Sequence, residues 1–118
     1  MQSKEYIKGT IKTIVLKLLS ENDRMYGYEI SQQVKELSQG ELELTYGALY
    51  PILYKLEKDG LLTTEAEVVD NRVRKYYSLT KQGKKTAKEK VADLDKFLDI
   101  IKVIIAPNPK PSMKLWGV

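Results

Sequence analysis

Three tyrosines and two lysines lie close together in the middle of the sequence, and their side chains are of the kinds that contact nucleic acid. Tyr46, Tyr50 and Tyr54 stand four residues apart, and Lys55 and Lys58 follow them. Four-residue spacing places side chains on one face of a helix. Rings, hydroxyls and ammonium groups suit a nucleic-acid groove, although tyrosines also half-bury against neighbouring helices. We favour DNA contact for Tyr46 and Tyr50 and packing for Tyr54.

A short helix must position these side chains, and it needs a buried face. Its apolar residues recur at helical spacing: Leu49, Ile52, Leu53 and Leu56. Thr45 can cap the start of the helix and Asp59-Gly60 can end it. Pro51 would fall in the second turn, and the alternative is a shorter helix that begins at Pro51. We favour the longer helix, because the carbonyl that Pro51 would crowd lies in the first turn, which has few internal hydrogen bonds.

Two further helices are predicted before this one. Apolar residues at helical spacing predict a first helix over residues 4–20. Met25–Ile30 leads into a second amphipathic helix, which carries Ile30, Val34 and Leu37 and ends in a polar, glycine-containing turn. The second and third helices then form a helix-turn-helix, in which the later helix is offered to the major groove of DNA.

A second group of cations is predicted beside the tyrosine-bearing helix. Threonine, valine and tyrosine on either side of Asp70-Asn71 predict a β-hairpin over residues 61–79. Its tip and returning strand carry Arg72, Arg74 and Lys75. A hairpin that follows a recognition helix and bears cations is typical of a wing, which lies along the phosphate backbone or reaches the minor groove.

A long helix is predicted from Thr80, as its cap, to about Ala106, where Pro107 ends it. Its apolar residues recur in alternating steps of four and three, which is a heptad seam: Ala87, Val91, Leu94, Leu98, Ile101 and Ile105. Phe97, Ile100 and Ile104 widen this face, so it offers more apolar surface than a small domain can cover. A second copy of the chain is the simplest cover, and packing on the first helix is the alternative. We expect both.

The whole chain of 118 residues is long enough for one core. Its net charge of +4 permits a nucleic-acid partner. It contains no cysteine and no histidine, which excludes disulfides, cysteine nucleophiles, Ser-His pairs and zinc sites built on either residue type. We expect no metal, no cofactor and no membrane span, and therefore a cytoplasmic protein. The expected organisation is a DNA-binding domain over residues 1–80, a dimerisation helix over 81–106 and a flexible, proline-rich tail over 107–118.

Three ordered motifs resemble the PadR family of bacterial winged-helix transcriptional regulators. They are Tyr26–Ile30, Tyr46–Leu62, and Arg74–Thr80 followed by Gly83, and the resemblance covers about residues 6 to 105. It implies an α+β winged helix-turn-helix fold, a long helix over Pro51, and a repressor that binds a palindromic operator as a homodimer held by the C-terminal helix. The short C-terminal extension resembles the smaller subgroup, some of whose members hold flat aromatic drugs between paired tryptophans. This chain offers Leu94 and Phe97 in the corresponding stretch.

These inferences yield three sets of candidate residues. The candidate DNA-binding residues are Thr45, Tyr46, Gly47, Tyr50, Lys55, Arg72, Arg74 and Lys75. The candidate dimerisation residues are Val91, Leu94, Phe97, Leu98, Ile101 and Ile105, and a small hydrophobic effector is expected near Leu94 and Phe97. The alternative function is a winged-helix module that binds protein rather than DNA. An enzyme is not expected, because the carboxylates are scattered among lysines and no pair lies in an evident pocket.

Overall fold

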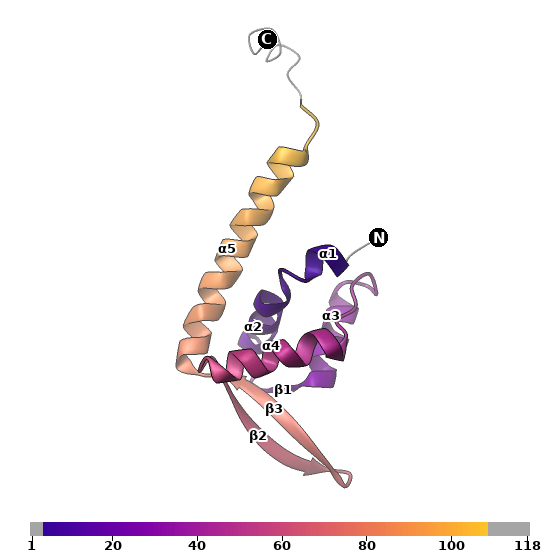
Figure 1. The fold of residues 1–118 in the computed structure, drawn as a ribbon, viewed down its shortest axis with the longest axis vertical. Helices are drawn as coiled ribbons and strands as arrows, with labels where there is room; N and C mark the ends of the chain where they lie inside the picture. Colours follow the sequence, from indigo (N-terminus) through magenta and orange to yellow (C-terminus); the bar gives the residue numbers. More distant parts are fainter. Residues whose placement is uncertain (1–3, 109–118) are drawn as a thin grey trace.

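The computed structural model describes residues 4–108, which form five helices and a three-stranded antiparallel sheet (Figure 1). In chain order the elements are α1 (Lys4–Ile7), α2 (Ile11–Ser20), β1 (Met25–Tyr26), α3 (Gly27–Leu37), α4 (Tyr46–Lys58), β2 (Leu62–Val69), β3 (Arg72–Leu79) and α5 (Lys81–Ile105). This is the predicted α+β arrangement of a helix-turn-helix, a hairpin and a long C-terminal helix. No helix within residues 4–108 is long and apolar enough to cross a membrane.

The core lies where α2, α3 and α4 meet the base of the hairpin. Its most deeply buried side chains come from these three helices: Val15, Leu16, Ile30, Leu49, Leu53 and Leu56. The predicted apolar face of α4 is therefore correct, with only Ile52 left partly exposed. Because each helix offers a single apolar stripe, the stripes must converge on one core.

The N-terminal helix differs from the prediction of one continuous helix over residues 4–20. The chain turns at Lys8–Thr10 and divides this segment into α1 and α2. The Thr10 N–H donates to the Ile7 carbonyl at 2.8 Å, and the Thr10 hydroxyl donates to the same oxygen at 2.9 Å. A threonine that bonds locally to the backbone competes with the helix, and Gly9 beside it has low helix propensity.

The sheet contains a strand that was not predicted. Met25 and Tyr26, which we expected to lead directly into the second helix, pair with Tyr77 and Tyr76 of β3, so the strand order is β1-β3-β2. The predicted hairpin is correct, with Leu62 opposite Leu79 at its base and Val69 opposite Arg72 at its tip. The two turn residues, Asp70 and Asn71, have φ values of 51° and 62°. Two left-handed residues in succession match the right-handed twist of a hairpin.

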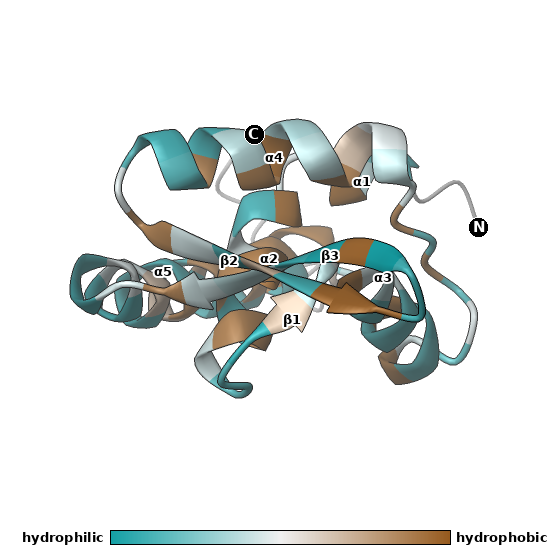
Figure 2. Cartoon of the chain, turned by 90° about the horizontal axis from the view of Figure 1, so that it is seen from below, coloured by the Kyte–Doolittle hydropathy of each residue, from teal (hydrophilic) through white to brown (hydrophobic). Residues whose placement is uncertain are grey.

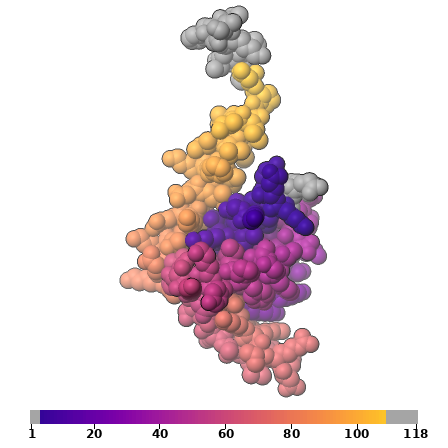
Figure 3. All heavy atoms as spheres, in the orientation of Figure 1, coloured from indigo at the N-terminus to yellow at the C-terminus, as the bar shows by residue number. Residues whose placement is uncertain are grey.

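The junction between hairpin and long helix is closely packed. Thr80 caps α5 by accepting from the Gly83 N–H at 3.0 Å, as predicted. The Thr80 N–H and hydroxyl also donate to the carbonyls of Leu61 at 3.0 Å and Gly60 at 2.7 Å. The first half of α5 then packs on α2, which confirms the expected intramolecular contact. Its second half projects beyond the body of the molecule (Figure 3).

Candidate nucleic-acid interface

The helix α4 begins and ends where the sequence predicts. The Thr45 hydroxyl accepts from the Ala48 N–H at 3.3 Å, and Gly60 follows the last turn with a φ of +78°. Pro51 lies inside α4, so the longer helix is correct. Seen from below, the apolar residues of α4 face the sheet and its paler and polar residues face outward (Figure 2). The outward face of α4 is therefore available to a partner.

Tyrosines dominate the outward face of α4. Tyr46 is 50% exposed and its ring lies 5.7 Å from that of Tyr50, which is 45% exposed. Gly47 beside them is also exposed. The packing expected of Tyr54 is wrong, because its side chain is 67% exposed. It lies on the solvent side of α4, where no neighbouring helix covers it.

Tyr50 has a structural contact as well as an exposed edge. Its ring lies directly against the backbone of Gly27 at the start of α3, and a Cβ built on Gly27 would stand 2.7 Å from Cζ of Tyr50. Only glycine allows this approach without displacing the ring. The contact joins the two helices of the helix-turn-helix and orients Tyr50 beside Tyr46.

The lysines of α4 point into solvent. The Lys55 ammonium lies 3.8 Å from the Asp59 carboxylate, and its side chain is 66% exposed. Lys58 is exposed as well. An exposed ion pair of this length contributes little to stability, so Lys55 can exchange Asp59 for a phosphate at small cost.

Strand alternation separates the three cations of the hairpin. Arg72 is exposed beside the turn, and Arg74 lies on the same face, with its guanidinium 4.5 Å above the Tyr26 ring. A hydrogen bond with the Tyr76 side chain raises the pKa of Arg74. Lys75 lies on the opposite face, where its ammonium is 3.4 Å from the Glu57 carboxylate of α4. The structure therefore brings Arg72 and Arg74 together and directs Lys75 toward α4.

Glu57 joins α4 to the hairpin through two strands. Besides the Lys75 ammonium, it accepts a hydrogen bond from the Thr64 hydroxyl at 3.2 Å. Tyr77 is buried beside this group, and desolvation is the main reason that the pKa of its hydroxyl is raised. The helix α4 and the hairpin thus share polar contacts as well as apolar packing.

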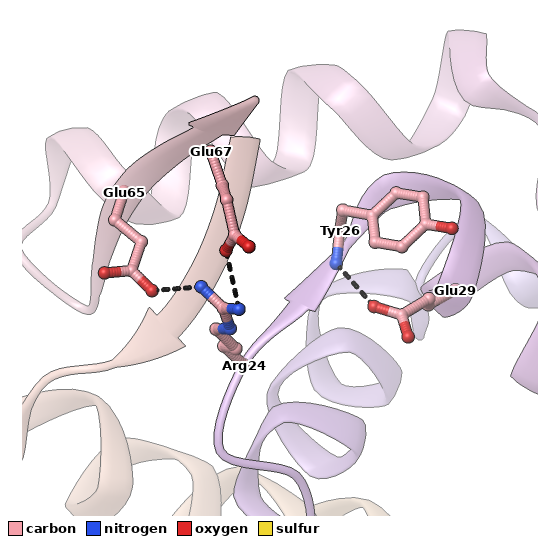
Figure 4. A network of polar contacts seen from close by, with 5 residues as sticks. All are labelled: Arg24, Tyr26, Glu29, Glu65 and Glu67. Atoms are coloured by element: carbon pink, nitrogen blue, oxygen red, sulfur yellow. Dashed lines mark hydrogen bonds and ion pairs between the residues drawn. The ribbon is translucent and has the colours of Figure 1, made fainter. Parts of the chain in front are cut away.

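Sequence reasoning missed a network on the other face of the sheet. The Arg24 guanidinium forms ion pairs with the carboxylates of Glu65 and Glu67 on β2, the second at 2.7 Å (Figure 4). The Tyr26 N–H, at the start of α3, donates to the Glu29 carboxylate at 3.1 Å. The alternation of Glu65 and Glu67 predicts only that they share a face, because their partner lies more than 40 positions earlier in the chain.

The seam of α5 lies partly over a groove and partly in solvent. Apolar side chains of α2, α3 and α5 enclose a groove of about 290 Å³, whose lining includes Ile14, Leu18, Leu37, Val91, Leu94 and Leu98. A second hollow between α1 and α5 shares Leu94 and Leu98. Phe97 lines neither of them and is 55% exposed, so the predicted effector residues Leu94 and Phe97 do not both line either of these two hollows. Of the other candidate dimerisation residues, Ile101 is half-buried and Ile105 is 74% exposed.

The described residues contain no group of three or more acidic side chains arranged to hold a metal ion. α4 exposes a tyrosine-rich face, and the hairpin beside it carries Arg72 and Arg74 on the sheet face opposite Lys75. Tyrosine rings and guanidinium groups are side chains that can contact bases and phosphates.

Comparison with known proteins places these features in one family. The sequence profile of the transcriptional regulator PadR-like family matches residues 15–89. Transcriptional regulator Rv3488 of Mycobacterium tuberculosis is 35% identical over 81 residues, which are 69% of this chain and 72% of that protein. A transcriptional regulator of Clostridium thermocellum superposes with a TM-score of 0.78 at 28% identity, over 86% of this chain and 99% of its own. A PadR family transcriptional regulator of Eggerthella lenta superposes with a TM-score of 0.74 at 28% identity, over 88% of each chain.

Proposed function

The chain belongs to the transcriptional regulator PadR-like family, and on that premise we propose that it is a repressor that binds a palindromic operator as a homodimer. The family consists of DNA-binding transcriptional regulators with the winged-helix fold, and not of enzymes. The proposal concerns the operator, the oligomer and the direction of regulation. Because its target is DNA, we also place the protein in the cytoplasm, with the chromosome.

The adjacency of two elements supports the DNA contact: α4 packs against β2, and both α4 and the hairpin expose side chains that can contact DNA. The helix packs along β2, so Tyr46 and Tyr50 lie on the element next to the strand pair that bears Arg72. In this arrangement α4 enters the major groove while the hairpin reaches the neighbouring backbone. Thr45, Gly47 and Lys55 are proposed to contact DNA from the same helix, and Arg74 from the hairpin. Lys75 is proposed to contribute less, because Glu57 holds it.

Exposed apolar side chains on α5 support the homodimer. Phe97, Leu98, Ile104 and Ile105 are each between 47% and 74% exposed, and a long apolar stripe of this kind is an interaction surface. A second copy that packs on this stripe and on the groove beneath it would cover both. Twofold symmetry of the protein then requires twofold symmetry of the operator, which is why we propose a palindrome.

We also propose that a small hydrophobic effector binds in the groove around Leu94. The apolar lining of this groove supports the proposal. If such a molecule binds there, aromatic compounds will raise the melting temperature and weaken DNA binding. If aromatic compounds change neither quantity, this part of the proposal is wrong.

The test of DNA binding is a fluorescence-anisotropy titration. The purified protein is titrated against duplex DNA from upstream of its own gene and against a scrambled duplex, each at two salt concentrations. We expect one dimer to bind the first duplex more tightly, and each phosphate contact to contribute about 0.9 to the negative slope of log affinity against log salt. Absence of binding at low salt would refute the proposal and favour a module that binds protein.

A further inference from the structure

Arg24 makes contacts that cross the whole sheet. It stands immediately before β1, yet its guanidinium reaches the carboxylates of Glu65 and Glu67 on β2, the strand at the opposite edge. The strand β3 lies between β1 and β2, and the Arg24 guanidinium stacks on the β3 residue Tyr76 at 3.9 Å from the ring centre. One side chain therefore connects the three strands, and Figure 4 shows its two ion pairs with β2.

The hairpin has few other attachments on this face. The ladder between β1 and β3 consists of two residue pairs, Met25 with Tyr77 and Tyr26 with Tyr76. Beyond them the hairpin projects into solvent, and Val68 and Val73 near its tip are each 72% exposed (Figure 1). Apolar burial therefore fixes the base of the hairpin but not its outer half.

The rings and guanidinium groups around Arg24 form a continuous stack. Tyr76 meets Tyr26 edge to face at a centroid distance of 5.4 Å, and Arg74 lies above Tyr26. Hydrogen bonds to the carboxylates of Glu67 and Glu65 raise the pKa of Arg24. Tyr26 is also the residue from which α3 begins, so the stack ties the hairpin to the first helix of the helix-turn-helix.

The carboxylates that Arg24 binds lie on the same face of the sheet as the hairpin arginines. Glu65 and Glu67 share their face of the sheet with Arg72 and Arg74, because alternate residues of paired strands point the same way. Without a partner, two carboxylates would lie on the surface that carries the phosphate-binding arginines, and they would repel DNA. Arg24 places a positive charge between them.

We propose that Arg24 is a positioning residue for DNA binding, which holds the hairpin in a fixed orientation relative to α3 and neutralises Glu65 and Glu67. The inference rests on the proposed function, because it assumes that the hairpin contacts DNA. It assigns a role to a residue that does not itself need to touch the operator.

The test compares Arg24→Ala with the wild-type protein in two assays. Hydrogen exchange of the free protein measures the opening of β2 and β3, and anisotropy measures affinity for the operator and scrambled duplexes. We expect faster exchange in the outer hairpin, and an affinity about threefold to tenfold lower for both duplexes at low salt, as expected for loss of two exposed ion pairs and a ring contact. Adding Glu65→Gln and Glu67→Gln to Arg24→Ala should restore part of the affinity, since it removes the carboxylate charges but not the mobility.

The matched control is Lys17→Ala, which removes one positive charge and the 2.7 Å ion pair with Glu21 from α2. It should leave hairpin exchange unchanged. If Arg24→Ala matches this control in exchange or in affinity, the positioning role is wrong, and if the added glutamines restore no affinity, the neutralising role is wrong. Failure of the wild-type protein to bind DNA would refute the proposed function instead, and the exchange data would still decide whether Arg24 fixes the hairpin.

Discussion

Gly83 occupies a place in α5 where no side chain fits, and its replacement by alanine should reveal how tightly the long helix is joined to the body. A Cβ built on Gly83 would overlap the carbonyl oxygen of Leu61, stand 3.0 Å from the Leu61 carbonyl carbon and lie 3.2 Å from a methyl group of Leu79. The Leu61 carbonyl cannot rotate away freely, because it already accepts the Thr80 N–H. The alanine methyl group at position 83 can be accommodated only if α5 moves away from the turn that follows α4.

Two opposing effects determine how much Gly83→Ala changes the free energy of unfolding. Carbon atoms in ordinary contact stand about 3.5–4.0 Å apart, so the first turn of α5 must move by roughly 0.5–1 Å or more. Forcing a methyl group into a packed site costs about 1–3 kcal/mol, and a backbone obstacle favours the upper end. Replacing a helical glycine by alanine returns about 1 kcal/mol. The expected net loss is therefore about 2 kcal/mol, or a melting temperature lower by roughly 10 °C for a domain of this size.

The assay is urea unfolding followed by circular dichroism, with Gly47→Ala as the matched control. Gly47 is also helical, but a Cβ built on it meets nothing within 4 Å, so the same substitution should stabilise the protein by about 0.5–1 kcal/mol. Equal protein concentrations are needed, since association changes apparent stability. The two variants should move the unfolding midpoint in opposite directions.

A midpoint for Gly83→Ala equal to or above that of the wild-type protein would refute this reasoning. It would mean that the junction of hairpin and helix can open by the width of a methyl group without loss. The geometry of α5 relative to α4 would then not be fixed, and a defined spacing of two recognition helices across a homodimer could not depend on it.

Three further predictions follow from the site and the seam. Arg72→Ala should lower affinity for operator and scrambled duplexes alike and reduce the salt slope by about 0.9, whereas Lys75→Ala should change that slope less, because Lys75 is already paired with α4. Above pH 10 the wild-type free energy of unfolding should fall, because the pKa of the Tyr77 hydroxyl is raised in the folded protein and this hydroxyl therefore ionises first in the unfolded chain. Urea titrations at pH 8 and pH 11 should show a smaller loss of stability for Tyr77→Phe than for the wild-type protein. Leu98→Glu should shift sedimentation toward the monomer, whereas Lys96→Glu on the same helix should not, and equal sedimentation of the two variants would contradict the proposed seam.

Much of the fold could be predicted from local patterns in the sequence. The bounds of α4 follow from Thr45 and Gly60, the hairpin turn from Asp70-Asn71, and the start of α5 from Thr80. Each of these signals acts within a few residues, through a cap or a left-handed backbone conformation. The family resemblance rests on the same segments and is confirmed.

The local patterns did not decide where an element would be interrupted or paired. Helical spacing predicts one helix over residues 4–20, yet a local hydrogen bond of Thr10 ends α1 before α2 begins. The two residues of β1 are too few to show strand alternation, and they become a strand only because β3 lies beside them. Pairing of this kind between β-strands that are distant in the sequence depends on the packed arrangement and not on the segment itself.

By itself the sequence determined which residue types the candidate interface carries, namely tyrosines on a helix and cations on a hairpin, because helical spacing and turn chemistry are local. Only the tertiary structure decided which of them are free to act. It left Tyr54 in solvent, paired Lys75 with Glu57, and set Arg24 across the sheet against Glu65 and Glu67. Ion pairs and burial depend on which distant residues the fold brings within a few ångströms, and no spacing along the chain contains that information.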